Sequence, residues 1–426
     1  MRRGALGGLL VAGLFASAQA DEIDRELARK AAPGADVASL IAIAREKNPG
    51  VAAMRFEADA ARERVSPSRA LPDPTLTTEL RDITNGGSGF NLNPSRIGAA
   101  RYQIAQMFPG WGKRDNKLFA AQAQAEEFAA RADAGWNETL RDLKMGWANY
   151  YRLHRTAALS REIRELMARL EAVARQRYGV GLAAQQDAIR AQVELTAMDG
   201  ELATLEAERH GQMARLNVVL DRDPEAPMAD PGEMPKLPEV DHARHNKLAE
   251  RLKEKNPALF AERARVTAAE KGRDVVYDNR SPDFKVGVGA VQMGSRIAEW
   301  ELMLEVNIPW QRDSRGAQER EAVSMLSAAQ MRKRAAEQQL VGELAHAVAD
   351  YEAARKLERL AAQNLLPQAE LTFSAALAGY ETGKVDFTTL LEAQRQIRQA
   401  RLTQLKAQTD ALVRLAEMEY AVGESL

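Results

Sequence analysis

The sequence predicts a mainly α-helical fold with a smaller β component, built from two copies of one structural unit. Three observations support this fold class: short motifs recur in the same order in both halves, each half contains a very long stretch free of helix breakers, and segments of alternating polarity come before each long stretch. We therefore expect duplicated long helical hairpins, each preceded by strands.

Two short motifs mark the duplication. Lys47-Asn48-Pro49 recurs as Lys255-Asn256-Pro257, and Tyr178-Gly179-Val180-Gly181 recurs as Tyr380-Glu381-Thr382-Gly383. Landmarks that return in order at a long period indicate a repeated structural unit. Five prolines between the halves indicate a linker. We expect a first repeat over residues 21–220, a linker over 221–241 and a second repeat over 242–426.

The first 20 residues have the features of a secretory signal peptide. Arg2 and Arg3 give a charged start, an apolar run follows to Ala16, and Ala18-Gln19-Ala20 forms a small-x-small cleavage site. The apolar run is shorter than the roughly 20 residues that a membrane-spanning helix needs, so a membrane anchor is the less favoured alternative. We expect residues 1–20 to be removed during export.

Apolar and polar residues alternate in two segments of each half. In the clearest segment Phe284, Val286 and Val288 alternate with Lys285 and Gly287. This period of two is typical of a strand with one apolar and one polar face. The alternation suits the wall of a transmembrane barrel, although a half-buried hairpin of a soluble domain is an alternative. Strands are predicted near residues 75–82, 100–108, 284–292 and 299–308.

The long stretches after each strand pair predict unusually long helices. At about 1.5 Å per residue, each would span roughly 100 Å. Apolar residues at Trp136, Leu140, Leu143 and Trp147 step by four and three, which is the spacing of coiled-coil packing. Pro367 lies inside the second stretch and predicts a bend. Long helices are predicted at residues 113–178 and 313–380, with return helices at 184–220 and 387–422.

Composition excludes several classes of function. The chain has no cysteine, so disulfides and thiolate metal sites are excluded. Its 59 basic residues nearly balance 60 acidic ones, which argues against a partner nucleic acid. His242 and His245 lie three apart, but without a clear third ligand they are better interpreted as a solvated pair. We therefore predict no enzyme activity, no catalytic residues, no cofactor and no metal site.

Taken together, these residues resemble the TolC-like outer-membrane efflux proteins over essentially the whole mature chain. The most specific motifs are Leu71-Pro72-Asp73-Pro74 before the first strand, Phe108-Pro109-Gly110-Trp111-Gly112-Lys113-Arg114 after the second, and the turn that begins at Tyr380. The resemblance implies a homotrimer in the outer membrane of a Gram-negative bacterium, extending into the periplasm. Each chain would give four strands to a shared 12-stranded β-barrel and its hairpins to a periplasmic α-barrel.

The resemblance also implies a function and partners. Such proteins are the exit ducts of tripartite efflux pumps, joined to a periplasmic adaptor protein and an inner-membrane RND-type transporter, with outer-membrane lipid around the barrel. The motif style is similar to the branch that exports heavy-metal cations. A duct of the same fold for drugs, solvents or type I secretion is an alternative. An exported coiled-coil structural protein is the alternative from another class, but it does not explain four matched strands.

The resemblance places a periplasmic gate at the hairpin ends. Asp187 matches the acidic gate residue of the family, and Tyr380 matches the gate tyrosine. An arginine that some members carry is Val385 here, and Lys384 is the expected substitute. Alternatively, the two tip tyrosines only cap the turns. The hairpin tips are assigned to Tyr178, Gly179, Gly181 and Gly383.

If the apolar residues of the strands face lipid, the opposite face lines the pore. This face carries four acidic and three basic residues, which predicts a mild cation preference. Charges that only keep the pore solvated are the alternative. The predicted lining residues are Glu79, Arg81, Arg101, Lys285, Glu299, Glu301 and Glu305.

Overall fold

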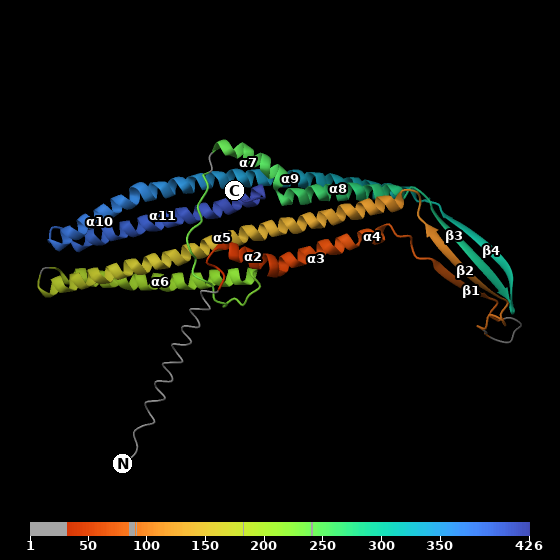
Figure 1. Ribbon diagram of the computed structural model, residues 1–426, viewed down its shortest axis with the longest axis horizontal. Helices are drawn as coiled ribbons and strands as arrows, with labels where there is room; N and C mark the ends of the chain where they lie inside the picture. The colour runs from red at the N-terminus through yellow and green to blue at the C-terminus, as the bar shows by residue number, and fades with distance from the viewer. Residues whose placement is uncertain (1–31, 85–89, 91, 182, 240–241) are drawn as a thin grey trace, which may run out of the picture. The chain divides into compact units, whose positions relative to one another are not determined.

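A computed structural model of the chain describes residues 32–84, 90, 92–181, 183–239 and 242–426 (Figure 1). The predicted signal peptide at residues 1–20 lies outside the described residues. Only the backbone is described for residues 242–246, so the side chains of His242 and His245 also lie outside.

The predicted fold class is confirmed, because the described part is mainly helical and contains a four-stranded antiparallel sheet. None of its helices has the length and apolar character needed to cross a membrane. The first half contains α2 (Val37–Lys47), α3 (Pro49–Glu63), α4 (Val65–Ser68), β1 (Thr75–Arg81), β2 (Ala99–Phe108), α5 (Lys113–Gly179) and α6 (Gln185–Val219). The second half contains α7 (His242–Lys255), α8 (Pro257–Asp278), β3 (Asp283–Met293), β4 (Arg296–Asn307), α9 (Arg312–Leu360), α10 (Leu366–Glu381) and α11 (Phe387–Val422).

A π-helix, Ala361–Leu365, joins α9 to α10 where the sequence predicts one long helix. Pro367 follows it in the first turn of α10. Proline has no backbone N–H, so the α-helical hydrogen-bond pattern cannot continue unchanged across this position. The wider turn of a π-helix is one way to re-pair the carbonyl groups that are left over.

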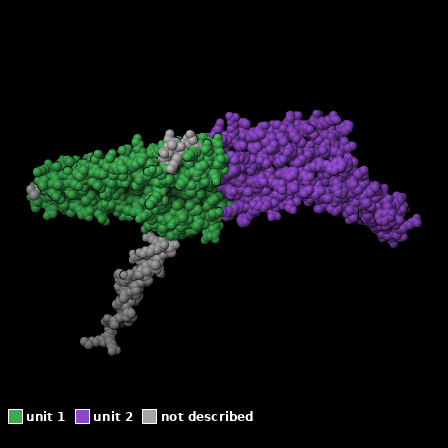
Figure 2. Space-filling model, turned by 45° about the horizontal axis from the view of Figure 1, so that its top comes forward, with its two compact units in different colours: residues 1–52, 135–256, 339–426 green, residues 53–134, 257–338 purple. Residues whose placement is uncertain are grey.

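The chain forms two compact units (Figure 2), and each unit takes segments from both repeats. The described residues of unit 1 lie within 32–52, 135–256 and 339–426, and they include the hairpin of α6 and that of α11. Unit 2 consists of residues 53–134 and 257–338, and it contains the sheet.

The duplicated Lys-Asn-Pro motif caps the return helices of unit 1. Asn48 donates from Nδ2 to the carbonyl of Val219, at the end of α6 (2.8 Å). Asn256 donates from Nδ2 to the carbonyls of Tyr420 and Ala421, at the end of α11 (3.1 and 2.8 Å). The last carbonyls of a helix have no partner within it, so the asparagines satisfy acceptors at Val219 and Ala421. The carbonyl of Tyr420 accepts from Asn137 as well (3.0 Å).

Aromatic side chains fix the linker and the N-terminal segment to the core of unit 1. Trp147 donates from Nε1 to the carbonyl of Gly34 (2.9 Å), and the Tyr150 hydroxyl donates to the carbonyl of Ala229 (3.2 Å). The rings themselves are buried. Each side chain therefore adds apolar burial to α5 and satisfies one backbone acceptor of an irregular segment.

Candidate functional site

The sheet has its strands in the order β1-β2-β3-β4, and all neighbouring pairs are antiparallel. The register aligns Leu76 with Ile104, Ile104 with Val288, and Val288 with Leu302. Since paired residues point to the same side of a sheet, these apolar side chains share one face. That face is exposed, and Leu302 has 80% of its surface accessible. The sheet is therefore apolar on its open face.

The opposite face is polar and better covered. Gln103 and Ala105 on this face are buried. The register places every predicted lining residue here, and some of them pair: Arg101 forms ion pairs with Glu301 (2.5 Å) and Glu79 (3.7 Å). Lys285 lies opposite Glu305 in the register. The predicted lining charges are thus gathered on one face, where the three acids of β4 lie along one strand and Glu79 and Glu305 lie opposite a base.

The loop between β2 and α5 explains much of the motif that begins at Phe108. Lys113 places its ammonium 2.8 Å from Oδ1 of Asp283, the first residue of β3. The same carboxylate accepts the backbone N–H of Gly110 (2.8 Å). A Cβ atom on Gly110 would lie 2.5 Å from the carbonyl of Pro282, so only glycine fits. Gly112 has φ of +84°, which favours glycine too.

The two hairpin tips are built on similar turns. Gly181 donates its N–H to the carbonyl of Tyr178, and Gly383 donates to that of Tyr380 (3.0 Å each). Both glycines have positive φ. Tyr178 is largely exposed, whereas Tyr380 has 2% of its surface accessible. The tips are therefore alike in backbone and different in what the tyrosine contacts.

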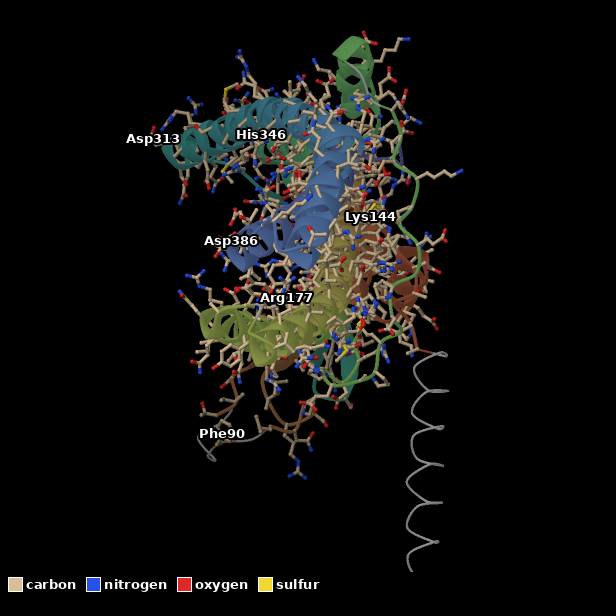
Figure 3. The ribbon with its side chains drawn as sticks, turned by 90° about the vertical axis from the view of Figure 1, so that its left-hand side faces the viewer. Phe90, Lys144, Arg177, Asp313, His346 and Asp386 are labelled. Atoms are coloured by element: carbon tan, nitrogen blue, oxygen red, sulfur yellow. The ribbon has the colours of Figure 1, made fainter. Side chains whose placement is uncertain are left out.

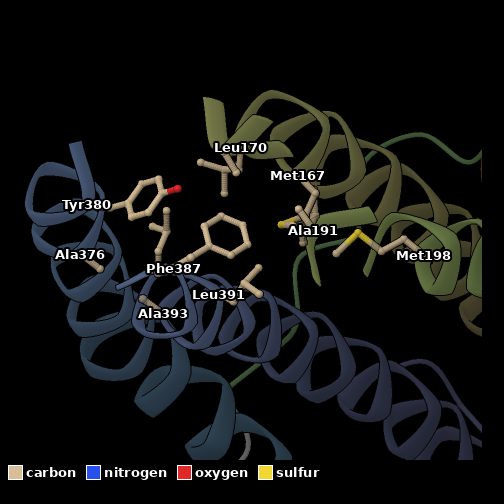
Figure 4. Close-up of a cluster of buried hydrophobic side chains, with 12 residues drawn as sticks. Met167, Leu170, Ala191, Met198, Ala376, Tyr380, Phe387, Leu391 and Ala393 are labelled. Carbon is tan, nitrogen blue, oxygen red and sulfur yellow. The ribbon is translucent and has the colours of Figure 1, made fainter. Parts of the chain in front are cut away.

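Tyr380 belongs to a buried cluster at the ends of the hairpins (Figure 4). Its ring centroid lies 5.4 Å from that of Phe387. These two side chains from α10 and α11 face Met167 and Leu170 of α5. Burial of large side chains from two hairpins in one cluster holds the hairpins together through the hydrophobic effect.

Among the predicted gate residues, Tyr380 and Asp187 interact by charge, with no hydrogen bond from the Tyr380 hydroxyl in the described part of the chain. Burial raises the pKa of Tyr380, and the nearby Asp187 carboxylate raises it further. The Tyr380 hydroxyl has no hydrogen-bond partner among the described residues. Within the same described residues, the Lys384 backbone N–H donates to Gly379 (2.8 Å), and no ion pair of its ammonium group is found.

Arg177 is a tip residue that the sequence analysis missed. Its side chain extends from α5 near the ends of the hairpins (Figure 3). Its guanidinium lies 4.8 Å from the centroid of the Tyr380 ring and donates to the carbonyls of Tyr380 and Glu381. Val385, where some members carry arginine, instead fills the space beside Gly379, because a Cβ there would lie 2.6 Å from Cγ2 of Val385. The cation at this tip therefore comes from the other hairpin. The only sequence signal was a base one residue before the first tip tyrosine.

Three arginines of α11 extend the contact between the hairpins. They are spaced by three along one helix face, and each pairs with a glutamate of α5 or α6 at 2.8 Å. Exposed pairs of this kind contribute little individually, but they fix how the two hairpins meet. The pairs are Arg395 with Glu194, Arg398 with Glu201, and Arg401 with Glu162.

In the described part of the chain, no three or more His, Cys, Asp or Glu side chains come together in a way that could hold a metal ion. The described part instead contains a sheet with an exposed apolar face and long paired helices. Such an arrangement can form a wall and a conduit.

Comparison with known proteins agrees with this architecture. The outer membrane efflux protein family matches residues 40–221 and 248–424. The chain is 25% identical over 407 residues to the cobalt-zinc-cadmium resistance protein CzcC of Cupriavidus metallidurans, covering 93% of this chain and 94% of that protein. The outer membrane protein VceC of Vibrio cholerae has a similar structure, with a TM-score of 0.77 at 16% identity over 91% of this chain and 96% of that one. CusC gives a TM-score of 0.74 at 16% identity over 91% and 92% of the two chains. This chain belongs to the outer membrane efflux protein family.

Proposed function

We propose that the chain is the outer-membrane exit duct of a tripartite efflux pump and passes heavy-metal cations. The observation that carries the proposal is the sheet with an exposed apolar face and its charged residues gathered on the opposite face. A soluble domain would bury the apolar face, whereas a membrane wall turns it towards lipid. The same observation disfavours the exported coiled-coil protein.

The sheet also supports assembly into a homotrimer. β1 and β4 each have a partner strand on one side only in the described sheet. Free strand edges cannot face lipid, because their N–H and C=O groups would lack partners. Pairing β4 of one copy with β1 of the next would close a 12-stranded barrel from three copies, the ring that the family likeness implies. The helices would then extend into the periplasm.

In this proposal the hairpin ends form the periplasmic gate. The duct is joined to a periplasmic adaptor protein and an inner-membrane RND-type transporter. Asp187 and Tyr380 hold the tip closed, with Arg177 supplying the cation that was expected from Lys384. Replacing Asp187→Ala and Tyr380→Phe together should raise single-channel conductance in a planar bilayer. Unchanged conductance would remove the gate assignment and leave the duct in place.

The choice of heavy-metal cations rests on the likeness to CzcC and on the polar sheet face. CzcC is named for resistance to cobalt, zinc and cadmium. The proposed pore face carries four acids and three bases in each copy, which favours cations mildly. A reversal potential measured across a salt gradient should show cation preference. Anion preference would contradict the pore assignment.

The cargo is tested by growth of a strain that lacks the gene. Gradients of zinc, cobalt, cadmium, copper and silver are compared with a panel of hydrophobic drugs. Selective sensitivity to metals, restored by the intact gene, is the expected result. Sensitivity to drugs alone would reject the metal cargo and favour a drug or solvent duct of the same fold.

A further inference from the structure

Two tryptophans are exposed at one end of the sheet. Trp111 follows β2 and has 92% of its surface accessible, and Trp310 follows β4 and has 86% accessible. β2 and β4 both run antiparallel to β3, so they end at the same edge. The two repeats therefore place two large amphipathic rings at the same edge of the sheet. Exposing the apolar part of such rings to water is unfavourable.

Trp111 lies beside the apolar side of the sheet. Its ring is 6.3 Å from the ring of Phe284, which shares its face with Phe108 and Val306 in the register. Trp310 lies beyond the end of β4, two residues after the exposed Ile308. Both tryptophans therefore lie at the edge of the sheet where β2 and β4 end.

A second aromatic level lies further along the strands. Trp300 is exposed, and the register aligns it with Ala290 and, across β3, with Tyr102. With a rise of about 3.3 Å per residue and a tilt of about 45°, an extended segment as long as Trp300 to Trp310 covers about 23 Å along the membrane normal. That is close to the roughly 25 Å height of the apolar band of outer-membrane barrels, which aromatic residues border on both sides.

A basic pocket of about 390 Å³ adjoins the edge of the sheet that carries Trp111 and Trp310. Its charged lining is three guanidinium groups and one carboxylate. Arg280 binds that carboxylate, and Arg315 donates to the carbonyl of Pro309, the residue before Trp310. Guanidinium groups pair well with phosphate oxygens, so the net positive lining suits a phosphodiester. The lining residues are Arg280, Pro309, Arg312, Arg315, Gly316 and Glu319.

We propose that the arginine pocket at this end of the sheet binds the phosphates of anionic phospholipid in the periplasmic leaflet, beside Trp111 and Trp310, which lie in the interfacial layer as aromatic residues of outer-membrane barrels do. Tryptophan favours this layer because one side of its ring is apolar and its N–H is polar. The inference rests on the proposed function, since it requires the sheet to be a membrane wall.

Depth measurements test the position. The chain has no cysteine, so single cysteines can be introduced directly: Gln311→Cys beside Trp310, Leu304→Cys in mid-strand, and Gln330→Cys on α9. Each carries a nitroxide label in vesicles of phosphatidylethanolamine and phosphatidylglycerol, and collision with oxygen and with a water-soluble nickel chelate gives its depth. We expect label 304 near the bilayer centre, label 311 at headgroup depth and label 330 in water.

The outcomes separate the two proposals. If label 304 lies in lipid but label 311 lies in bulk water or in the acyl region, the headgroup contact is overturned and the membrane wall stands. If label 304 lies in water, the proposed function itself fails. Replacing both Trp111 and Trp310 by alanine should shift label 304 relative to the bilayer centre, whereas Phe56→Ala, at another exposed aromatic, should leave it in place. No shift in the double variant would overturn the anchoring role.

The arginine pocket is tested with brominated lipids. A fluorophore attached to the Gln311→Cys variant should be quenched better by brominated phosphatidylglycerol than by brominated phosphatidylcholine. Adding Arg312→Gln should reduce this preference about fivefold, the effect of one basic residue near an anionic surface. Adding Arg320→Gln instead, on the same helix but outside the pocket lining, should retain it. Equal quenching by both lipids in the unmodified pocket would overturn the phosphate assignment.

Discussion

The guanidinium of Arg177 lies over the ring of Tyr380 and donates to the carbonyl oxygen of the same residue. One side chain of α5 thus binds both the aromatic ring and the last backbone acceptors of α10. The C-terminal end of a helix carries a partial negative charge, so a cation is favourable there. Opening the hairpins would separate all of these groups together.

Replacing Arg177→Met should therefore loosen the end of α10. Hydrogen bonds to a charged group contribute about 1.5–3 kcal/mol, and a loss of about 1.4 kcal/mol corresponds to a tenfold larger open population. The rate of hydrogen–deuterium exchange of the backbone amides of residues 376–381 should therefore rise at least about tenfold. Arg175→Met is the matched control, because Arg175 pairs with Glu171 of its own helix. Equal exchange in both variants would show that the interhelical bonds contribute nothing.

The duplicated asparagines give a second prediction, on stability. Replacing Asn256→Ala leaves the buried carbonyl of Ala421 without this donor, while Tyr420 still accepts from Asn137, and an unsatisfied buried group costs about 1–3 kcal/mol. Asn48→Ala should cost less, because its bond to Val219 is only partly buried. Urea unfolding of the helical part, followed by circular dichroism, gives both values. The reverse order of the two losses would contradict this account.

Charge on the apolar sheet face should be tolerated far less than charge on the polar face. Leu304→Arg should destabilise the protein in bilayers by about 2–4 kcal/mol if residue 304 lies near the membrane centre. Glu305→Arg, at the next position on the opposite face, should cost much less. Denaturant unfolding in liposomes compares the two. Similar losses would mean that neither face is in lipid.

Alkaline pH should destabilise the contact between α9 and the linker. Tyr351 is buried and donates to the carbonyl of Pro238 (2.6 Å), and burial raises its pKa to about 12. Because the folded state favours the neutral phenol, its contribution is complete below the unfolded pKa of about 10 and is lost as the pH rises through 12. Tyr351→Phe should weaken the fall in stability above about pH 10. It should also cost about 1 kcal/mol at neutral pH through the lost hydrogen bond.

The control for this pH dependence is internal to the chain. Burial also raises the pKa of Tyr380 and Tyr420, so part of the alkaline loss should remain in the variant. Chemical denaturation between about pH 8 and pH 12 would measure both curves. Superimposable curves for the two proteins would show that Tyr351 does not contribute.

The two faces of the sheet could be predicted from local periodicity. Contacts between residues far apart in the sequence could not. Phe284 and Val286 alternate with Lys285 and Gly287, so their two faces follow from the sequence alone. The partner of Arg177 does not, because Tyr380 lies 203 residues away and nothing local marks the pair. The resemblance predicts Tyr380, and Val385 at the arginine position makes Lys384 the expected cation. In the structure the cation that contacts Tyr380 is Arg177, from the other hairpin.

The irregular helix near Pro367 shows a similar limit. The missing N–H of proline is readable from the sequence, and it predicted a disturbance at this place. Whether the chain responds with a kink, a broken helix or a wider turn depends on how neighbouring turns pack. The π-helix Ala361–Leu365 is therefore a tertiary outcome.

The pairing of β2 with β3 has a consequence for the order of biogenesis. A chain exported from its N-terminus can bring Asn48 to Val219 as soon as α6 has emerged. The pairing of Ile104 with Val288, by contrast, must wait for the second half. Until then β1 and β2, which have an apolar face, lack the rest of the sheet, and such unpaired strands are prone to mispairing and aggregation. If the chain is exported as proposed, a periplasmic chaperone would be needed most in that interval.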